Sequence, residues 1–244
     1  KNLTNNVQFV YINIVENKKK IVFVTPQTHP DVGAFKAAIK DIEEYEFSVI
    51  KAEDVLSPFT DVDLLILYQL PAKGEKKLSN YLSSFKGNVL YMTGGKTSFN
   101  YLNRYQKFFD YKPRVEMEAV GVHGSTVFTK FNLEDDVRTF FQSAPKLWSN
   151  QANIKFNGSH EHLYQSKIFS LNTEQPVMTF GELAGRTYGL INGEGLWQWR
   201  LHDFRENQNH DNFNTLIRQM VRYLVSKESL QRFRLDIPSR VLGN

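Results

Sequence analysis

The chain of 244 residues contains no cysteine. This absence excludes disulfide bonds, Cys-ligated zinc, iron–sulfur clusters and thiol catalysis. It does not decide the compartment, because a disulfide-free chain can fold in the cytoplasm and equally in a cell envelope, where a large core supplies stability.

Long apolar runs and an apolar leader are also missing. No stretch approaches the roughly 20 consecutive apolar residues that span a bilayer. The first residues, KNLTNNVQ, are polar and unlike a signal peptide. The sequence starts with a lysine and not a methionine, so we expect it to be a piece of a longer protein.

Strong charge of one sign is absent as well. The formal net charge is +4, with a pI near 9.0, and the Lys and Arg residues are scattered. The densest run, Lys18–Lys20, directly precedes an apolar strand. We interpret it as a solvated turn and expect no nucleic-acid partner, because such a footprint needs a clustered basic face.

What the chain does have is enough apolar material for a core, with 41% hydrophobic and 14% aromatic residues. Short apolar runs alternate with segments of helical spacing, as in Ile21–Thr25 before Val32–Ile42, and Val62–Tyr68 before Glu75–Phe85. Asp31 is a plausible cap of the first of these helices. This order predicts an α/β fold with a doubly wound, mostly parallel sheet of the flavodoxin-like kind.

The middle of the chain changes character. Val115–Thr129 and Leu163–Leu171 alternate in the manner of exposed strands, which predicts an antiparallel insertion or extension. The run Gly193–Leu201, GEGLWQWRL, also reads as strand, with Trp197 and Trp199 on one face. We expect an edge strand in residues 1–18, the α/β domain in 19–228, and a linker or the start of a following β domain in 229–244.

The candidate site is the strand-turn-helix Asn88–Arg104, because such turns at the carboxyl ends of strands can present a nucleophile or hold an anion. Gly94–Thr97 is half of a phosphate-binding P-loop, but the position that needs the earlier glycine is Leu90. Three interpretations stay open: a structural turn, an anion site at the helix amides, or a hydroxyl nucleophile at Thr97 or Ser98.

A hydroxyl nucleophile needs a base, and His29 and His202 are the two candidates. His160 and His162 flank Glu161 and would share one side of a strand, but a third metal ligand is missing nearby, so we assign no metal. Trp197 and Trp199 are either packing aromatics or a stacking platform for a sugar or peptide. No cofactor is expected.

Four segments resemble the class I glutamine amidotransferase-like domains, in the version embedded in bacterial envelope proteins. They are Thr28–Ile39 (THPDVGAFKAAI), Asp63–Pro71 (DLLILYQLP), Val89–Asn100 (VLYMTGGKTSFN) and Gly193–Phe204 (GEGLWQWRLHDF). The resemblance covers roughly Lys20–Lys227. It implies a domain held beside β domains, on the extracytoplasmic side of a membrane-anchored protein.

The chain departs from that family where its chemistry lies. The family's turn carries a cysteine, with a histidine and a glutamate from near the end of the domain, whereas this turn carries Thr93–Lys96 and no histidine stands beside Glu194. We therefore expect a pseudoenzyme, a non-catalytic module for interaction or scaffolding with protein partners or flanking domains. The alternatives are a hydrolase or transferase with a Ser/Thr nucleophile and an anion or small-molecule sensor. The expected ligand-binding residues are Thr93, Gly94, Gly95, Lys96, Thr97, Ser98, Glu194 and Trp197.

Overall fold

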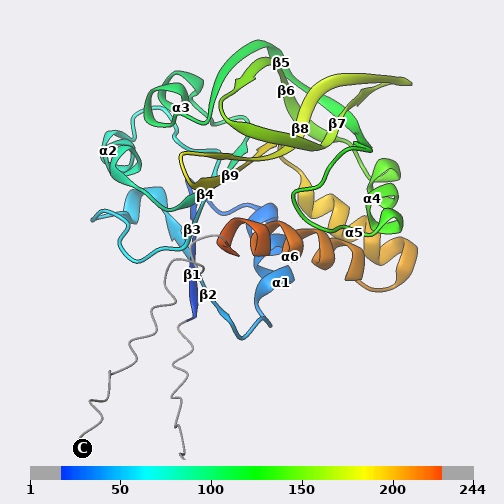
Figure 1. The fold of residues 1–244 in the computed structure, drawn as a ribbon, viewed down its shortest axis with the longest axis horizontal. Helices are drawn as coiled ribbons and strands as arrows, with labels where there is room; N and C mark the ends of the chain where they lie inside the picture. Colours follow the sequence, from blue (N-terminus) through cyan, green and yellow to red (C-terminus); the bar gives the residue numbers. More distant parts are fainter. Residues whose placement is uncertain (1–17, 227–244) are drawn as a thin grey trace, which may run out of the picture.

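The computed structural model describes residues 18–226, which form one nine-stranded sheet in the order β2-β1-β3-β4-β9-β8-β7-β5-β6 (Figure 1). The strands are β1 (Lys19–Thr25), β2 (Tyr45–Lys51), β3 (Leu64–Tyr68), β4 (Asn88–Thr93), β5 (Phe109–Gly124), β6 (Leu147–Phe156), β7 (Ser159–Ile168), β8 (Leu171–Leu183) and β9 (Arg186–Asn192). The helices are α1 (Pro30–Ile39), α2 (Lys76–Ser84), α3 (Phe99–Tyr105), α4 (Asp135–Phe140), α5 (Leu196–Asn207) and α6 (Asp211–Ser226), with short 3-10 turns η1 (Ala52–Asp54) and η2 (Phe141–Ser143).

The sheet is mixed, so the prediction of a doubly wound, mostly parallel, flavodoxin-like sheet is wrong. The pairs from β2 to β9 are parallel, and the four remaining pairs are antiparallel. The antiparallel strands are also the longer ones, with 16 residues in β5 and 13 in β8, against five to seven in each parallel-only strand. The error has a physical cause. Buried parallel strands give conspicuous apolar runs, while half-exposed antiparallel strands alternate, so the predicted antiparallel insertion or extension looks like an addition to a parallel sheet and not like half of it.

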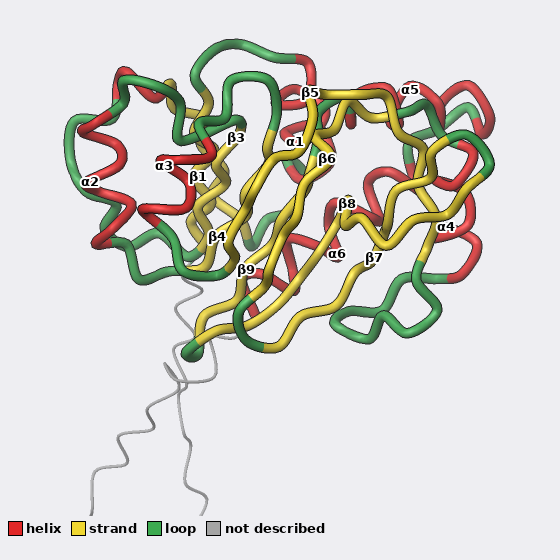
Figure 2. Tube along the Cα trace, turned by 90° about the horizontal axis from the view of Figure 1, so that it is seen from above, coloured by secondary structure: helices red, strands yellow, loops and turns green. Residues whose placement is uncertain are grey.

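The parallel half is sandwiched between helices (Figure 2). Every residue of β3 and β4 is buried. On one face, Phe23 packs in a core with Phe35 of α1 and Leu216 of α6. On the other, Leu65 packs in a second core with Leu78 of α2 and Leu102 of α3. Burial on both faces explains why these strands are continuous apolar runs.

The run Gly193–Leu201 is not a strand as predicted, because most of it belongs to α5. Gly195 precedes the helix at φ 110°, a left-handed conformation that favours glycine. The buried residues of α5 follow helical spacing: Leu196, Trp199, His202 and Asp203. Trp199 stacks on Phe141 in the core, while Trp197 is half-buried on another face. Three residues, Trp-Gln-Trp, are too few to distinguish the two-residue period of a strand from the 3.6-residue period of a helix. The spacing of the buried residues from Leu196 to Asp203 shows that the segment is a helix.

The edge strand predicted in residues 1–18 lies outside the described residues except for Lys18, and so does the whole of the segment 229–244, predicted as a linker or the start of a β domain. Within residues 18–226, none of the helices has the length and apolar character that a membrane crossing requires. Lys19, from the basic run, lies in β1 and its ammonium pairs with Asp63 at 3.1 Å.

Candidate functional site

The predicted turn lies where the parallel strands β1, β3, β4 and β9 end, and four of its backbone amides are already engaged. The Gly94 amide donates to Thr97 Oγ1 at 3.0 Å, and the Lys96 amide donates to Gln69 Oε1 at 3.1 Å. The amides of Thr97 and Ser98 donate to backbone carbonyls at 3.0 and 2.9 Å. An anion at this turn would have to displace internal hydrogen bonds, and α3 behind it has only seven residues.

The three hydroxyls of the turn lack a base. Thr93 Oγ1 donates to Asn192 Oδ1 at 3.0 Å, Thr97 Oγ1 accepts from the Gly94 amide, and Ser98 makes no capping hydrogen bond. In residues 18–226, none of these hydroxyls hydrogen-bonds an imidazole or a carboxylate. A hydroxyl nucleophile needs such a partner to lose its proton, so the described site contains no activated nucleophile.

Two glutamine side chains connect the turn to neighbouring segments: Gln69 reaches Glu194, and Gln27 reaches the turn residue Lys96. Gln69 Nε2 donates to the Glu194 carboxylate, while Lys96 Nζ donates to Gln27 Oε1. Only glycine fits at position 94, because a Cβ there would lie 2.5 Å from Glu194 Oε2 and 2.8 Å from Gln69 Cδ. The space beside Gly94, where a ligand was expected, is thus filled by the protein's own side chains.

Asp31 does not cap its own helix as predicted; it caps α5. The N-cap of α1 is His29, whose Nδ1 accepts from the Asp31 amide at 3.1 Å. The Asp31 carboxylate, 1% exposed, accepts from the Gly195 amide at 2.9 Å and the Trp197 amide at 2.7 Å. A carboxylate at the positive end of α5 is electrostatically favourable. Trp197 therefore joins this site through its backbone, and its side chain packs against the core.

His29 and Tyr68 complete the Asp31 cluster. Tyr68 donates its hydroxyl to Asp31 Oδ2 at 2.9 Å and lies 2.7 Å from His29 Nδ1. Burial, followed by the charge of Asp31, raises the pKa of Tyr68 far above its ordinary value, so the phenol stays protonated. His29 thus serves Tyr68 and α1 and does not reach the turn hydroxyls, and His202 is buried on α5 with its ring 5.0 Å from that of Phe140.

Asn192, which the sequence analysis missed, links the two halves of the sheet. Its side-chain oxygen accepts from the hydroxyls of Thr93 and Tyr111, at 3.0 and 2.6 Å. Its amide donates to the carbonyls of Asn150 and Pro176, at 3.1 and 3.2 Å. These partners lie 16 to 99 residues away along the chain, so no local pattern indicates the role.

His160 and His162 lie on β7 with ring centroids 5.5 Å apart. His162 Nδ1 is 2.8 Å from Thr179 Oγ1, and burial, with a smaller contribution from His160, lowers the pKa of His162 to about 4. Across residues 18–226, no three His, Cys, Asp or Glu side chains gather in a way that could hold a metal ion.

Comparison with known proteins gives structural likenesses only. No family model matches the chain, and no curated protein matches it in sequence. A GH42 beta-galactosidase from G. stearothermophilus is 12% identical, with a TM-score of 0.47 over 79% of this chain and 30% of that one. A Thermoplasma acidophilum protein described as a GMP synthase subunit is 12% identical, with a TM-score of 0.49 over 88% and 98%. A beta-galactosidase from Bacillus circulans sp. alkalophilus is 9% identical, with a TM-score of 0.47 over 86% and 31%.

These findings correct the family assignment. The chain spans about a third of the length of the two galactosidases, and likenesses at this level carry no functional argument. The amidotransferase-like and flavodoxin-like assignment is not supported, because no family model matches and the sheet is mixed. Of the four motifs behind it, Gly193–Phe204 is also helical over most of its length, and not the strand that was predicted for it.

Proposed function

We propose that this chain is a non-catalytic module that acts in protein interaction or scaffolding. One observation carries the proposal: the polar groups at the carboxyl ends of the parallel strands hydrogen-bond one another. Asp31 caps α5, Gln69 bridges the turn and Glu194, and Asn192 satisfies Thr93. Polar groups already satisfied in this way hold a shape, and within residues 18–226 the hydroxyls of Thr93, Thr97 and Ser98 have no base beside them to activate an attack on a substrate.

The antiparallel half offers the surface for a protein partner. Phe169, at the turn between β7 and β8, is 89% exposed, and the neighbouring Leu171 is 68% exposed. Trp148 at the start of β6 is 50% exposed and pairs through its backbone with Glu194, at 3.0 and 2.9 Å. Exposed aromatic side chains of this kind are enriched at interaction sites.

A turnover screen tests the non-catalytic part. Wild type, Ser98→Ala and Glu194→Gln are assayed with p-nitrophenyl esters, p-nitrophenyl glycosides and glutamine, and Ser143→Ala serves as a matched exposed serine. We expect the same background rate for all four proteins. A rate that Ser98→Ala or Glu194→Gln abolishes, and that Ser143→Ala retains, would establish an enzyme.

A capture experiment tests the interaction part. Phe169→Ser combined with Leu171→Ser should lose the partner that the wild-type protein retains from an extract of its source organism. Leu56→Ser is the matched control, because Leu56 is 80% exposed but lies in the parallel half. Equal capture by all three proteins would remove the antiparallel surface from the proposal.

The expected placement in a membrane-anchored envelope protein stays a prediction, which fractionation of the full-length protein tests.

A further inference from the structure

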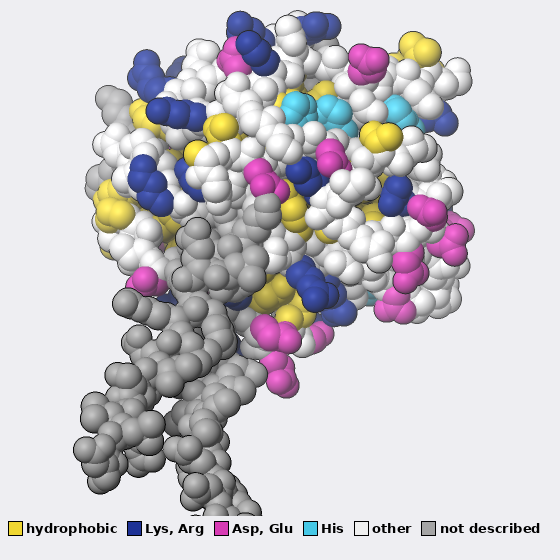
Figure 3. Space-filling view, viewed as in Figure 1, with side chains coloured by type: hydrophobic (Ala, Val, Ile, Leu, Met, Phe, Trp, Pro, Cys, Tyr) yellow, Lys and Arg dark blue, Asp and Glu magenta, His cyan; other side chains and the backbone are white. Residues whose placement is uncertain are grey.

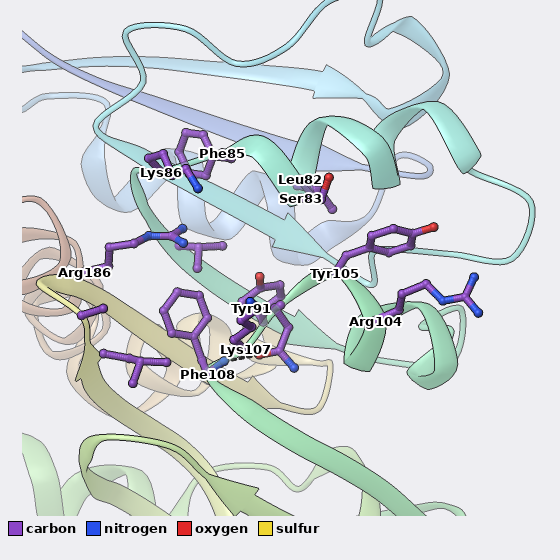
Figure 4. Close-up of a pocket in the computed structure, with 14 residues that line it drawn as sticks. Leu82, Ser83, Phe85, Lys86, Tyr91, Arg104, Tyr105, Lys107, Phe108 and Arg186 are labelled. Atoms are coloured by element: carbon purple, nitrogen blue, oxygen red, sulfur yellow. Dashed lines mark hydrogen bonds between the residues drawn. The ribbon is translucent and has the colours of Figure 1, made fainter.

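A pocket of about 250 Å³ lies at the opposite end of the parallel strands from the predicted site. Its walls come from the ends of α2 and α3, the starts of β4 and β9, and the chain leading into β5 (Figure 4). Phe85, Lys86 and Arg186 lie on one side, Arg104 and Tyr105 on the other, and Tyr91 and Phe108 lie between them.

The charge of this pocket is one-sided. Four of the residues that line it are cationic, Lys86, Arg104, Lys107 and Arg186, and none of the lining residues is acidic. Within residues 18–226, Lys86, Arg104 and Lys107 form no ion pair. Figure 3 shows Lys and Arg side chains over the α2–α3 side of the molecule, whereas acidic side chains gather toward α4. Like charges held together repel one another, so this pocket is electrostatically suited to an anion.

The walls between these cations are aromatic. The Arg186 guanidinium lies 4.9 Å from the ring centroid of Phe108 and 6.0 Å from that of Phe85, and donates to the Gly87 carbonyl at 3.0 and 2.6 Å. Phe108 in turn stacks on Tyr188, with ring centroids 4.7 Å apart. These contacts fix the guanidinium and the rings before any ligand arrives, and planar faces of this kind favour planar ligands.

Tyr91 adds an unused polar group. The residue is 5% exposed and lines the pocket, yet its hydroxyl makes no hydrogen bond to any described residue. A ligand oxygen, or a water that it displaces, would satisfy this donor at the floor of the pocket.

We infer that this pocket binds a small organic anion that carries one planar ring, of the size of an aryl phosphate or aryl carboxylate. The cations bind the anionic group, the aromatic walls and the guanidinium face take the ring, and Tyr91 donates to an oxygen. A volume of about 250 Å³ lies at the small end of ligand sites, which excludes large ligands. The inference goes beyond the proposed function, because it concerns the opposite end of the sheet and no residue of the predicted turn.

The test separates ring from charge. Isotope-labelled full chain is titrated with phenyl phosphate, which has both, with inorganic phosphate, which has only the charge, and with phenol, which has only the ring. We expect phenyl phosphate to shift the amides of Lys86, Tyr105 and Lys107 with a Kd of about 1 mM, and each of the other two to bind about tenfold more weakly. The amides of Gly94–Ser98 should not move.

Conservative variants locate the site. Lys86→Gln and Lys107→Gln should each weaken phenyl phosphate about threefold, since solvent screening limits each exposed charge. Tyr91→Phe keeps the ring and removes only the hydroxyl, and should weaken it by a similar factor. Lys36→Gln, an exposed lysine on α1, is the matched control and should have no effect.

Three results would overturn the inference. One is the absence of a saturable shift up to about 10 mM phenyl phosphate, where a ligand of this size should bind. The second is equal affinity for inorganic phosphate, which leaves the ring without a role. The third is a Lys36→Gln effect as large as that of Lys86→Gln, which would mean that binding depends on the net charge of the chain and not on this pocket.

Discussion

The two ends of the parallel strands differ in how their polar groups are satisfied. At the carboxyl ends, Asp31, Gln69 and Asn192 each join segments distant in sequence, and their hydrogen-bonding groups face other protein groups. At the amino ends, Lys86 and Lys107 approach an aromatic pocket with no carboxylate in its lining. The fold alone would place a ligand at the carboxyl ends. The side chains instead favour the opposite end, because an interaction site needs groups that are still unpaired.

The largest expected loss of stability comes from a substitution at the carboxyl ends of the parallel strands, where the polar groups are paired. Asp31→Ala leaves the amides of Gly195 and Trp197 and the hydroxyl of Tyr68 without their acceptor, all in a buried site. We expect a loss of about 3 kcal/mol in the free energy of unfolding, measured in urea, because the acceptor is charged and its donors are desolvated. Asp135→Ala, at a side chain 92% exposed, should change stability little. Equal losses for the two variants would mean that the hydrogen bonds to Asp31 do not stabilise the carboxyl ends of the strands.

The next effect concerns the link between the halves of the sheet. Asn192→Ala removes an acceptor for two hydroxyls and a donor to two carbonyls, and should cost about 2 kcal/mol. Thr93→Val removes only one of these hydrogen bonds, and should cost about 1 kcal/mol. Both are measured by chemical unfolding, and a Thr93→Val loss that matches the Asn192→Ala loss would contradict a shared hub at Asn192.

Acid should act on the antiparallel half through His162. Because the pKa of His162 falls to about 4 in the folded protein, the unfolded chain takes up this proton first. Stability from neutral His162 is complete above pH 6.5 and is lost as the pH falls toward 4, by about 1 kcal/mol after allowance for the partial exposure of the ring. His162→Gln should flatten the pH dependence of unfolding in that window, and His160→Gln should keep it. An unchanged slope in His162→Gln would assign the titration elsewhere.

The smallest effect tests whether the predicted turn is mainly structural. Ser98 precedes α3 but its hydroxyl makes no capping hydrogen bond. Ser98→Ala should therefore cost less than about 0.5 kcal/mol, whereas a capping serine is worth about 1 kcal/mol. Thermal unfolding checks this, and a loss above about 1 kcal/mol would show an engaged hydroxyl.

Local patterns predict the elements of the parallel half closely, and beyond them they predict antiparallel strands without their pairing. The apolar runs of β1, β3 and β4, and the helical spacing of α1 and α2, mark these elements within a few residues. The same kind of pattern gives the wrong structure for α5, because Trp-Gln-Trp fits a strand over three residues. Alternation also predicts an antiparallel insertion or extension in the middle of the chain, and β5–β8 form such an extension, because they continue the same sheet beyond β9.

Both ends of the sheet depend on contacts that no window of the sequence contains. Asp31 binds amides 164 and 166 residues away, so a capping rule points to the wrong helix. The four cations of the pocket come from three separate segments, which is why the Lys and Arg residues look scattered in the sequence. Only the turn itself can be predicted from a short window of the sequence, because its glycines and the strand and helix beside it are contiguous in the chain.

The position of β9 beside β4 sets an order for synthesis. β9 is the neighbour that completes the parallel half, and it follows β4 only after all four antiparallel strands have been made. The hydrogen bonds of Asp31 form later still, because the helix that it caps begins at Leu196. On the ribosome, the elements from β1 to β4 must therefore persist as an unfinished half until the chain has emerged through Asn192, the last residue of β9, and such non-local closure is a slow step.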